Sequence, residues 1–433
     1  MTRILVTGIN HAPENIGIGK YTGEMCRWLA ARGHEVRMVA APPYYPAWRV
    51  WPGHRRWWFR REQLDGVDVI RCPLWVPRTP RGATRLLHLV SFGLSSACAL
   101  AYSLAWRPQV VVNVAPTLTS APAAWALSRL SGARCWLHIQ DFELDAALNM
   151  GIVDAGPARR VAVALERWLL RRFDTVSTIS GRMLERLGAK GVAPERQALF
   201  PNWADIDGVR PLEGASPYRA ELGIPDGAVV ALYSGNMSLK QGLELLGEAA
   251  ARLAAEPGLY FVFGGQGPGR GLLEQACAGL PNVRFLDLQP SERLNDWLGL
   301  ADIHLLPQRA DVADLVMPSK LTGMLASGRA ILATAHPGTG LAHALQGSGV
   351  VVPPGDAAAF SEALLALAGD AAERQRLGAA ARLQAERTLA RDGILARFEQ
   401  QLLALHRGPA EAGQGEGQAL SSAPPDAAGR REA

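Results

Sequence analysis

The stretch RILVTGINHAPENIGIGKYTGEMCRWLAARGHEVRMVA, residues 3–40, decides the fold class. A short β-branched run, ILVTG, leads into a loop with glycine and proline, a helix-length amphipathic segment follows, and a second β-branched run, VRMVAA, begins at residue 36. Strand, helix and strand in this order form a βαβ unit, whose two strands run parallel. The sequence therefore predicts a parallel sheet with helices packed on it.

The same alternation continues along the chain and then starts again. Runs of the first series begin near residues 67, 110 and 135 and end with QALF at 197–200, and those of the second series begin near 228, 259, 283, 302, 330 and 349. Two similar α/β domains fit this pattern better than one long sheet. We place their boundary in the polar, proline-bearing stretch 201–219, which gives an N-terminal domain at 1–208 and a C-terminal domain at 209–407.

The last part of the chain changes in composition. A segment from Asp370 to His406 is rich in Ala, Arg, Glu and Leu and has a helical period, so we expect it to close the second domain or to pack back across the first. Beyond Arg407 the composition shifts to Gly, Ala, Glu, Pro and Ser, and we expect residues 408–433 to form a disordered tail.

The overall composition points to an enzyme. A chain of 433 residues, 48% hydrophobic and 20% charged, can bury large cores, which excludes a peptide-sized module and a disordered or fibrous protein. The net charge of +5 conceals an asymmetry, because residues 1–200 hold 26 basic and 14 acidic residues and the rest of the chain holds 19 and 26. We expect the basic half to attract anionic partners.

Cysteine usage and the N-terminus bear on the compartment. Five scattered cysteines, an odd number without paired spacing, argue against a disulfide framework or a zinc cluster. The N-terminus passes from a strand-like run into a loop and lacks a signal-peptide pattern. Both features lead us to expect a cytoplasmic protein.

A basic and aromatic run is the first candidate for contact with a membrane. HRRWWFRR, residues 54–61, places three aromatic residues between pairs of arginines, as interfacial anchors on anionic lipid do. A solvated loop with its aromatic residues tucked under it, or a contact with nucleic acid, are the alternatives. No nucleic-acid motif accompanies the charge, so we expect no such partner. The predicted membrane-contact residues are Arg55, Arg56, Trp57, Trp58, Phe59, Arg60 and Arg61.

An apolar stretch at residues 86–106 is the second candidate. As a helix it is long enough to span about 30 Å of hydrocarbon. However, His88 and several serines and glycines dilute it, and it falls where the βαβ series needs a helix. We expect a buried crossover helix, with contact to a membrane as the alternative.

Lysine is scarce in this chain. Only four of the 45 basic residues are lysines, and three of them follow glycine- or proline-bearing loops near expected helix starts. A lysine in the first turn of a helix opposes the helix dipole unless an anion is bound there, and such loops bind phosphate through backbone N–H groups. We therefore expect a dispersed cationic clamp on a phosphorylated ligand between the two domains. Its predicted residues are Gly17, Gly19, Lys20, Gly235, Lys240, Pro318, Ser319 and Lys320.

Five stretches give the chain a resemblance to a known family. They are residues 10–48, WLHIQDFELDAAL at 136–148, LFPNWAD at 199–205, YSGNMSLKQGLE at 233–244 and DLVMPSKLTGMLASG at 314–328. In this order they resemble the retaining glycosyltransferases of family 4, and more closely a WcaI-type subgroup of colanic-acid enzymes that are regarded as fucosyltransferases. The resemblance implies an α/β protein of the GT-B fold, with two Rossmann-like doubly wound domains that face each other across a cleft.

The same resemblance implies roles for individual residues. The N-terminal domain would bind the acceptor, and the segment after its fifth strand makes His138 and Asp141 the candidates for catalytic contacts at the transferred sugar or the acceptor hydroxyl. The C-terminal domain would bind the nucleotide sugar. There Asn236 stands where the family commonly has an arginine on the pyrophosphate, and Lys240 lies near the position of the family's lysine.

The sequence departs from the family at a pair of glutamates. The second of them, which binds the nucleotide ribose, falls on Gly323, and the first falls close to Asp314 or Leu315. We therefore expect an altered donor site in which Lys320 and its loop still hold phosphate. Asp311 and Asp314 make no convincing metal site, so we expect neither a metal nor a cofactor.

The implied reaction is metal-independent glycosyl transfer with retention at the anomeric carbon. The expected donor is a nucleoside diphosphate sugar, GDP-fucose first, and the expected acceptor is a polyprenyl-diphosphate-linked saccharide of a colanic-acid-like exopolysaccharide. The enzyme would associate peripherally with the anionic inner face of the cytoplasmic membrane. The alternatives are a UDP-sugar-dependent transferase of the same fold, a nucleotide-sugar epimerase or phosphorylase, and a non-catalytic nucleotide-sugar-binding protein.

Overall fold

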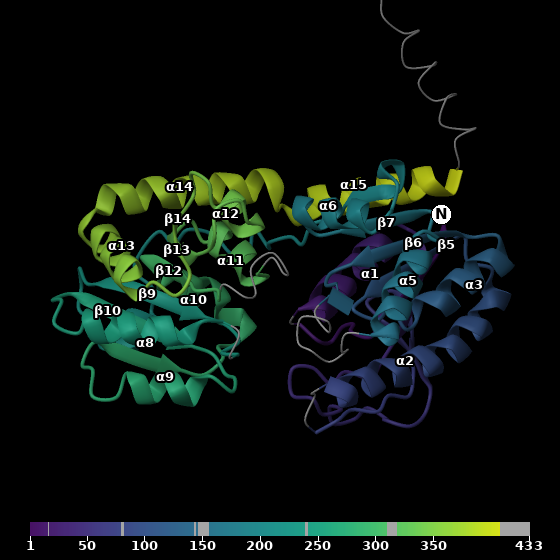
Figure 1. Ribbon diagram of the computed structural model, residues 1–433, viewed down its shortest axis with the longest axis horizontal. Coiled ribbons are helices and arrows are strands. Elements are labelled where there is room, and N and C mark those ends of the chain that lie inside the picture. Colours follow the sequence, from purple (N-terminus) through teal and green to yellow (C-terminus); the bar gives the residue numbers. More distant parts are fainter. Residues whose placement is uncertain are drawn as a thin grey trace, which may run out of the picture. The chain divides into compact units, whose positions relative to one another are not determined.

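The structure, a computed structural model, describes residues 1–15, 17–78, 82–142, 144–145, 156–238, 241–309 and 318–407 (Figure 1). The chain divides into two compact units. The first unit holds Met1–Leu137, Trp168–Thr175 and the chain from Leu395 onward, and the second holds His138–Arg167 and Val176–Ile394.

The N-terminal sheet has eight strands in the order β3-β4-β2-β1-β5-β6-β7-β8. Its strands are β1 (Arg3–Thr7), β2 (Glu35–Ala40), β3 (Arg60–Leu64), β4 (Val67–Arg71), β5 (Val110–Ala115), β6 (Arg134–Ile139), β7 (Thr175–Thr178) and β8 (Gln197–Leu199). Strand β1 pairs in parallel with β2 and β5, and the edge strand β3 pairs antiparallel with β4. The division between the two units runs through β6.

Burial on both faces explains the composition of these strands. Every residue of β5 is buried, and so are the residues of β1 after Arg3, because helices cover a parallel sheet on its two sides. The helices of this part of the chain are α1 (Ile18–Ala31), α2 (Gly82–Ser103), α3 (Ala121–Ser131), α5 (Pro157–Leu170) and α6 (Gly181–Ala189), and a 3-10 turn, η1 (Leu104–Trp106), follows α2.

The C-terminal sheet has six strands in the order β11-β10-β9-β12-β13-β14, and its pairings are all parallel. The strands are β9 (Val229–Ser234), β10 (Leu259–Gly264), β11 (Val283–Leu286), β12 (Ile303–Leu306), β13 (Ala330–Thr334) and β14 (Val350–Val352). The first strand of the series therefore lies inside the sheet, as in a doubly wound Rossmann-like domain. The predicted fold class is confirmed for this sheet.

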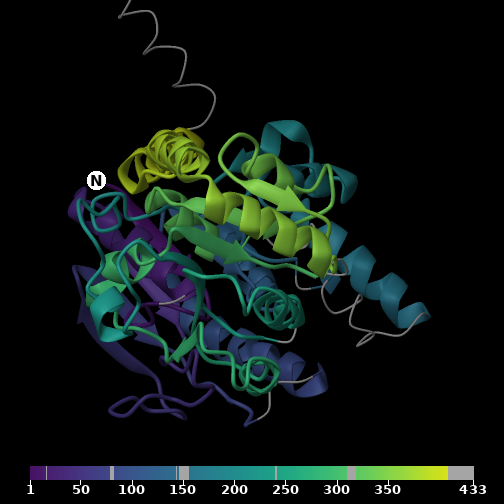
Figure 2. The same ribbon diagram turned by 90° about the vertical axis from the view of Figure 1, so that its left-hand side faces the viewer.

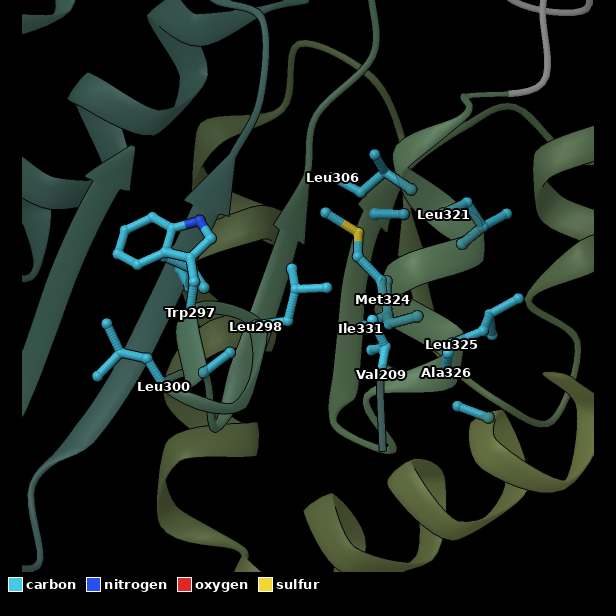
Figure 3. Close-up of a cluster of buried hydrophobic side chains, with 14 of the residues drawn as sticks. Val209, Trp297, Leu298, Leu300, Leu306, Leu321, Met324, Leu325, Ala326 and Ile331 are labelled. Carbon is cyan, nitrogen blue, oxygen red and sulfur yellow. The ribbon is translucent and has the colours of Figure 1, made fainter. Parts of the chain in front are cut away.

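Helices lie over both faces of the C-terminal sheet (Figures 1 and 2). Alternate residues of its strands fill two cores, one on each face. One core contains Leu306 and Ile331 together with Trp297 and Met324 (Figure 3). The other contains the neighbouring strand residue Leu305, with side chains of four further helices. The helices of this part are α7 (Tyr218–Glu221), α8 (Leu243–Arg252), α9 (Arg270–Ala276), α10 (Leu294–Gly299), α11 (Lys320–Ala326), α12 (Gly340–Ala344), α13 (Ala357–Gly369), α14 (Ala371–Thr388) and α15 (Arg391–Arg407).

The expected strands form within a few residues of their predicted positions, while β3 and β7 were not expected. The helical segment 370–406 is two helices. Helix α14 packs on α11 and β13 of the second unit, whereas α15 places the Phe398 ring 5.2 Å from the Trp136 ring of the first unit. Both expected destinations of this segment are thus realised, one by each helix.

Helix α2 is the crossover helix between β4 and β5, as predicted, but it is not a buried one. Leu94 and Tyr102 on its outer side are 70% and 62% exposed. The expectation of a buried helix is wrong for this face. The domain boundary at residues 208 and 209 stays a prediction, and the expected tail, 408–433, lies outside the described residues.

Candidate active site

The topology of the C-terminal sheet marks a place for a ligand. Strand β9 pairs with β10 on one side and with β12 on the other, so the direction of winding reverses between β9 and β12. In open α/β sheets ligands bind beyond the carboxyl ends of the strands at such a switch point. The loop that begins at Gly235 follows β9, and Arg309 lies shortly after β12. Both segments therefore border the expected position of a ligand.

Two glycine-bearing loops lie against each other at this edge. Gly265 and Gly267, after β10, have φ angles of 146° and 152°, a region that strongly favours glycine. A Cβ on Gly265 would stand 1.9 Å from the carbonyl oxygen of Gly235, and one on Gly267 would stand 2.6 Å from that of Met237. Only glycines allow this approach, and they leave the backbone open to a ligand. This second loop was not predicted as part of the site, although the three glycines at 264–267, directly after a predicted strand, are a signal for it.

Lys320, the first residue of α11, comes from a distant part of the chain and lies beside the loop that begins at Gly235. Its Nζ donates to Oε1 of Gln241 at 3.0 Å and lies 4.1 Å from the centre of the Tyr233 ring. A Cβ on Gly235 would be 3.7 Å from Cδ of Lys320. Desolvation lowers the pKa of the Lys320 ammonium to about 7. The structure therefore brings together two predicted residues, Gly235 and Lys320, and the Lys320 ammonium has no carboxylate partner within the described residues.

The other predicted donor residues have less defined surroundings. Asn236 is exposed, and its backbone carbonyl accepts a hydrogen bond from the Tyr233 hydroxyl at 2.7 Å. Ser319 is the N-cap residue of α11, as expected for a helix start, but its side chain makes no capping bond. Pro318 precedes it and is partly buried. Lys240 lies outside the described residues, as do Asp311, Asp314 and Leu315.

Gly323, at the position where the family has a glutamate, packs closely against Leu298. It lies in α11, and a Cβ on it would meet Cδ1 of Leu298 at 3.2 Å, which is tighter than ordinary contact. Leu298 is buried in the core of the second unit (Figure 3). A longer side chain at position 323 would have to displace Leu298, so the departure from the family pattern is built into the packing.

Arg309 is a further cation at this edge that the sequence analysis missed. A Cβ on Gly242 would lie 3.5 Å from Cγ of Arg309, so the arginine packs beside the loop that carries Gln241. Its Nη1 is 3.6 Å from Oε1 of Glu244, an exposed carboxylate. A basic residue directly after a strand at a switch point is the signal that could have found it.

The N-terminal loop with Gly17, Gly19 and Lys20 is built around a buried carboxylate. Glu14 is 2% exposed, and its Oε1 accepts the backbone N–H groups of Tyr44 and Tyr45 at 2.7 and 2.8 Å. Burial raises the pKa of Glu14. A Cβ on Gly19 would be 2.7 Å from Cβ of Glu14, so this glycine is needed for packing.

Lys20 lines a pocket of about 320 Å³ in the first unit. Glu24 and Arg27 of the same helix line it as well, together with Asp65, which pairs with Arg27 at 2.8 Å. Gly17 has φ 59° and precedes the first residue of α1. The predicted contact of Gly17, Gly19 and Lys20 with a diphosphate stays a prediction.

His138 is a buried, fully bonded residue of β6. It is 2% exposed; its Nδ1 lies 2.9 Å from the Ser177 hydroxyl, and its Nε2 lies 3.0 Å from the side-chain amide of Gln140. That amide also donates to Oδ1 of Asn202 at 3.0 Å. Desolvation lowers the pKa of His138 to about 3, so the ring is neutral and a weak base near pH 7. Asp141, two residues beyond the strand, is partly exposed.

The predicted membrane-contact segment forms an exposed loop and the start of β3. Trp57, Trp58 and Phe59 are 59%, 70% and 50% exposed, which excludes a loop with tucked aromatic residues. Arg56 lies over the Trp57 ring at 4.5 Å. Arg55, Arg60 and Arg61 complete the predicted set. All three are exposed, and Arg60 and Arg61 begin β3.

No group of three or more His, Cys, Asp and Glu side chains that could hold a metal ion occurs within the described residues. The site on the second sheet thus consists of the loop glycines, the cations Lys320 and Arg309, and the side-chain amide of Gln241. Such a set suits the phosphates of a ligand, because backbone N–H groups and an ammonium both attract negative charge.

Comparisons with known proteins agree with these features. Residues 17–203 match the family model of the glycosyl transferase 4-like domain, and residues 228–370 match that of glycosyl transferases group 1. The chain is 44% identical over 406 residues to a protein of Escherichia coli K12 that carries the provisional name colanic acid biosynthesis glycosyl transferase WcaI, covering 92% of this chain and 98% of that one. It is 29% identical over 341 residues to 2-deoxystreptamine N-acetyl-D-glucosaminyltransferase of Streptomyces fradiae, covering 74% and 78%.

Solved structures share the fold at low identity. Sucrose-phosphate synthase from Thermosynechococcus elongatus has a TM-score of 0.71 and 18% identity, covering 98% of this chain and 100% of that one. Anabaena Alr3699/HepE in complex with UDP and glucose has a TM-score of 0.67 and 14% identity, covering 93% and 99%.

Proposed function

The chain belongs to the family 4 glycosyltransferases and has the GT-B fold, and from this premise we propose that it moves a sugar from a nucleoside diphosphate sugar to a lipid-linked saccharide in exopolysaccharide biosynthesis. The observation that carries the proposal is the meeting of Lys320, Gln241 and Gly235 at the switch point of the second sheet. The exopolysaccharide context is supported by the similarity to the colanic acid biosynthesis protein.

The proposed chemistry needs a site that holds negative charge. The bond between the anomeric carbon and the β-phosphate oxygen breaks, a bond to the acceptor hydroxyl oxygen forms on the same face, and the departing diphosphate gains charge. The ammonium of Lys320 and the backbone N–H groups of the glycine loops would stabilise that charge without a metal or a cofactor. The acceptor proton would leave with the diphosphate or pass to Asp141, because the buried His138 is a weak base.

We propose fucose from GDP-fucose as the transferred sugar. The support is the resemblance to the WcaI-type subgroup, which extends to the loss of the ribose-binding glutamate at Gly323. Because Gly323 has no side chain to contact the ribose, a group other than residue 323 would contact the nucleoside here. A UDP-sugar is the competing donor.

We further propose that the acceptor is carried by polyprenyl diphosphate and that the enzyme works at the inner face of the cytoplasmic membrane. The basic N-terminal half and the exposed Trp57, Trp58 and Phe59 support this, because anionic lipid attracts arginine and aromatic residues anchor at the interface. Replacement of the three aromatic residues by serine should release the protein from anionic vesicles, and unchanged sedimentation would contradict the membrane contact.

A donor screen tests the reaction. The protein is incubated with GDP-fucose and with other GDP- and UDP-sugars, each with membrane-extracted polyprenyl-diphosphate saccharides, and the products are read by mass spectrometry and by NMR of the anomeric proton. Transfer from GDP-fucose with retention is the expected result. Isomerisation of the donor without an acceptor would show an epimerase, and a lack of turnover with every donor would leave a binding protein.

Substitution of Lys320 tests its role in binding the nucleotide of the donor. Calorimetry should show that Lys320→Ala loses at least tenfold in affinity for GDP or UDP. Arg376→Ala is the matched control, since this exposed arginine of the second unit pairs with Glu373 of its own helix. Equal nucleotide affinity of parent and Lys320→Ala would refute the role of Lys320.

A further inference from the structure

Helix α2 exposes an apolar stripe that runs along most of its length. After two adjacent leucines at its start, its members are three or four residues apart and thus continue along one side of the helix. Leu86, Leu87, Leu94 and Tyr102 are 54%, 58%, 70% and 62% exposed. The α2 stripe consists of Leu86, Leu87, Val90, Leu94, Cys98 and Tyr102. From Leu86 to Tyr102 it extends about 24 Å at the rise of an α-helix.

The opposite face of α2 is fixed to the first unit. His88 and Phe92 are buried, and Nδ1 of His88 lies 2.7 Å from the carbonyl oxygen of Trp75. The Ser91 hydroxyl accepts the N–H of Trp75 at 3.2 Å, and the Ser95 hydroxyl donates to the carbonyl of Pro73 at 2.7 Å. The helix is the one among the described residues that is long and apolar enough to cross a membrane. Its bonded face keeps it in the fold, so it can only lie along a surface.

The charged residues around the α2 stripe indicate what kind of surface it would bind. No aspartate or glutamate occurs from residue 69 to residue 140. Exposed arginines stand at both ends of the helix, Arg78 and Arg85 before the stripe and Arg107 after it. A second copy of the stripe would bring arginines against arginines in either direction, which costs free energy, whereas anionic lipid headgroups would be attracted to them.

The exposed aromatic loop is attached next to this helix. The N–H of Leu74 donates to the carbonyl of Arg56 at 3.0 Å, and the segment of Leu74 is the one bonded to α2. At the other end of the loop, Arg61 lies near Tyr102, a member of the stripe, and Asp68 and, to a smaller extent, Tyr102 raise the pKa of its guanidinium. The loop with Trp57 and Trp58 and the stripe thus belong to one connected part of the first unit; helix α2 is labelled in Figure 1.

We propose that the α2 stripe docks on an anionic bilayer, with the helix parallel to the membrane plane and its leucines at the boundary between headgroups and acyl chains. This inference rests on the membrane partner in the proposed function and extends it from a loop anchor to a helical face. An amphipathic helix in this position adds apolar burial to the attraction of the arginines. The docked face would set the first unit in a defined orientation toward a lipid-linked acceptor.

Cys98 offers a direct test, because it lies in the stripe and is the exposed one of the five cysteines, all of which lie in the described part of the chain. The full chain is labelled at Cys98 with an environment-sensitive fluorophore and mixed with vesicles of phosphatidylglycerol and phosphatidylcholine. A blue shift with anionic vesicles, and quenching by lipids brominated near the headgroup more than by those brominated at the acyl end, are expected. Vesicle binding without a shift would overturn the proposal and leave the loop as the anchor. A shift that grows with protein concentration in the absence of vesicles would show a contact between copies instead.

Charge substitutions test the unlabelled protein. Leu86→Glu/Leu94→Glu should weaken partition into anionic vesicles at least tenfold, since both side chains are exposed and their replacement leaves the core intact. Leu272→Glu, at a 63% exposed leucine of α9 in the second unit, is the matched control and should not change partition. Equal partition of all three proteins would overturn the proposal. Nucleotide affinity, measured in parallel, separates this outcome from a failure of the proposed transferase reaction.

Discussion

Binding of a nucleoside diphosphate should be coupled to proton uptake by Lys320. In the free enzyme desolvation lowers the pKa of this lysine from 10.5 to about 7, so that at pH 8 roughly nine in ten molecules hold it neutral. A diphosphate beside Nζ favours the charged form and raises the pKa again. The complex should therefore form with uptake of close to one proton at pH 8. Apparent affinity for GDP or UDP should fall about fivefold from pH 7 to 8 and close to tenfold from 8 to 9.

Calorimetry measures this coupling directly. Titration with GDP or UDP at pH 8 in buffers of different ionisation enthalpy gives the number of protons taken up, and at this pH the nucleotide is already fully ionised, since its terminal phosphate has a pKa near 6. Lys320→Met should bind more weakly and take up no proton. Uptake near zero in the parent protein, or the same uptake in Lys320→Met, would refute the reasoning.

The lowered pKa of Lys320 also affects how the free energy of unfolding changes with pH. Between pH 7 and 10.5 the unfolded chain binds more protons at this lysine than the folded chain does, so its contribution makes the free energy of unfolding rise with pH across that window. Lys320→Met should remove this slope in urea titrations. The two measurements test one property, because both depend on the same desolvated ammonium.

Three other substitutions give independent checks. Gly265→Ala should lower the melting temperature by several degrees, since its Cβ would stand 1.9 Å from the Gly235 carbonyl oxygen; Gly271→Ala, which meets nothing within 4 Å, is the control in the same thermal scan. Glu14→Ala should cost about 1–3 kcal/mol or more in urea unfolding, because two buried backbone N–H groups lose their acceptor, and an unchanged midpoint would contradict this. His138→Asn should leave both limbs of the pH profile of kcat/KM in place, because a group with pKa about 3 does not titrate there; loss of a limb near pH 6.5 would identify His138 as the base.

The strands that could be predicted from the sequence share a physical cause. A parallel strand buried on both faces must be apolar throughout, so VVVNVA at 110–115 is visible without any partner. Strand β3, RREQL, lies at the sheet edge with an exposed and partly exposed pattern, and a run of polar residues carries no such signal. Strand β7, TVST, is short and its buried residues include Ser177 and Thr178, which reads as a turn.

The candidate site was predictable only where single residues are unusual. Scarcity of lysine drew attention to Lys320, and a glycine after a strand drew attention to Gly235. Gln241, the hydrogen-bond partner of Lys320, lies 79 positions from it, and such a pairing depends on how the helix packs, which local patterns do not contain. The burial of His138 was hidden for the same reason, because its covering groups, Ser177 and Phe200, come from later in the chain.

The choice of lysine in an arginine-rich chain has a physical rationale at this site. Among the lysines of the described residues, Lys190 pairs with Asp145 and Glu166 at 2.8 and 2.7 Å and has a structural role, whereas Lys320 contacts a neutral amide and an aromatic ring. Arginine stays charged in proteins, while a desolvated lysine can lose its proton when the anion departs. A neutralisable cation therefore holds the diphosphate while it is present and does not leave a buried charge behind when the product is released. Lys320→Arg should accordingly bind GDP or UDP with an affinity that hardly changes from pH 7 to 9 and should release the nucleotide more slowly in stopped-flow measurements. A Lys320→Arg enzyme that kept the pH dependence of the parent would show that another group takes up the proton.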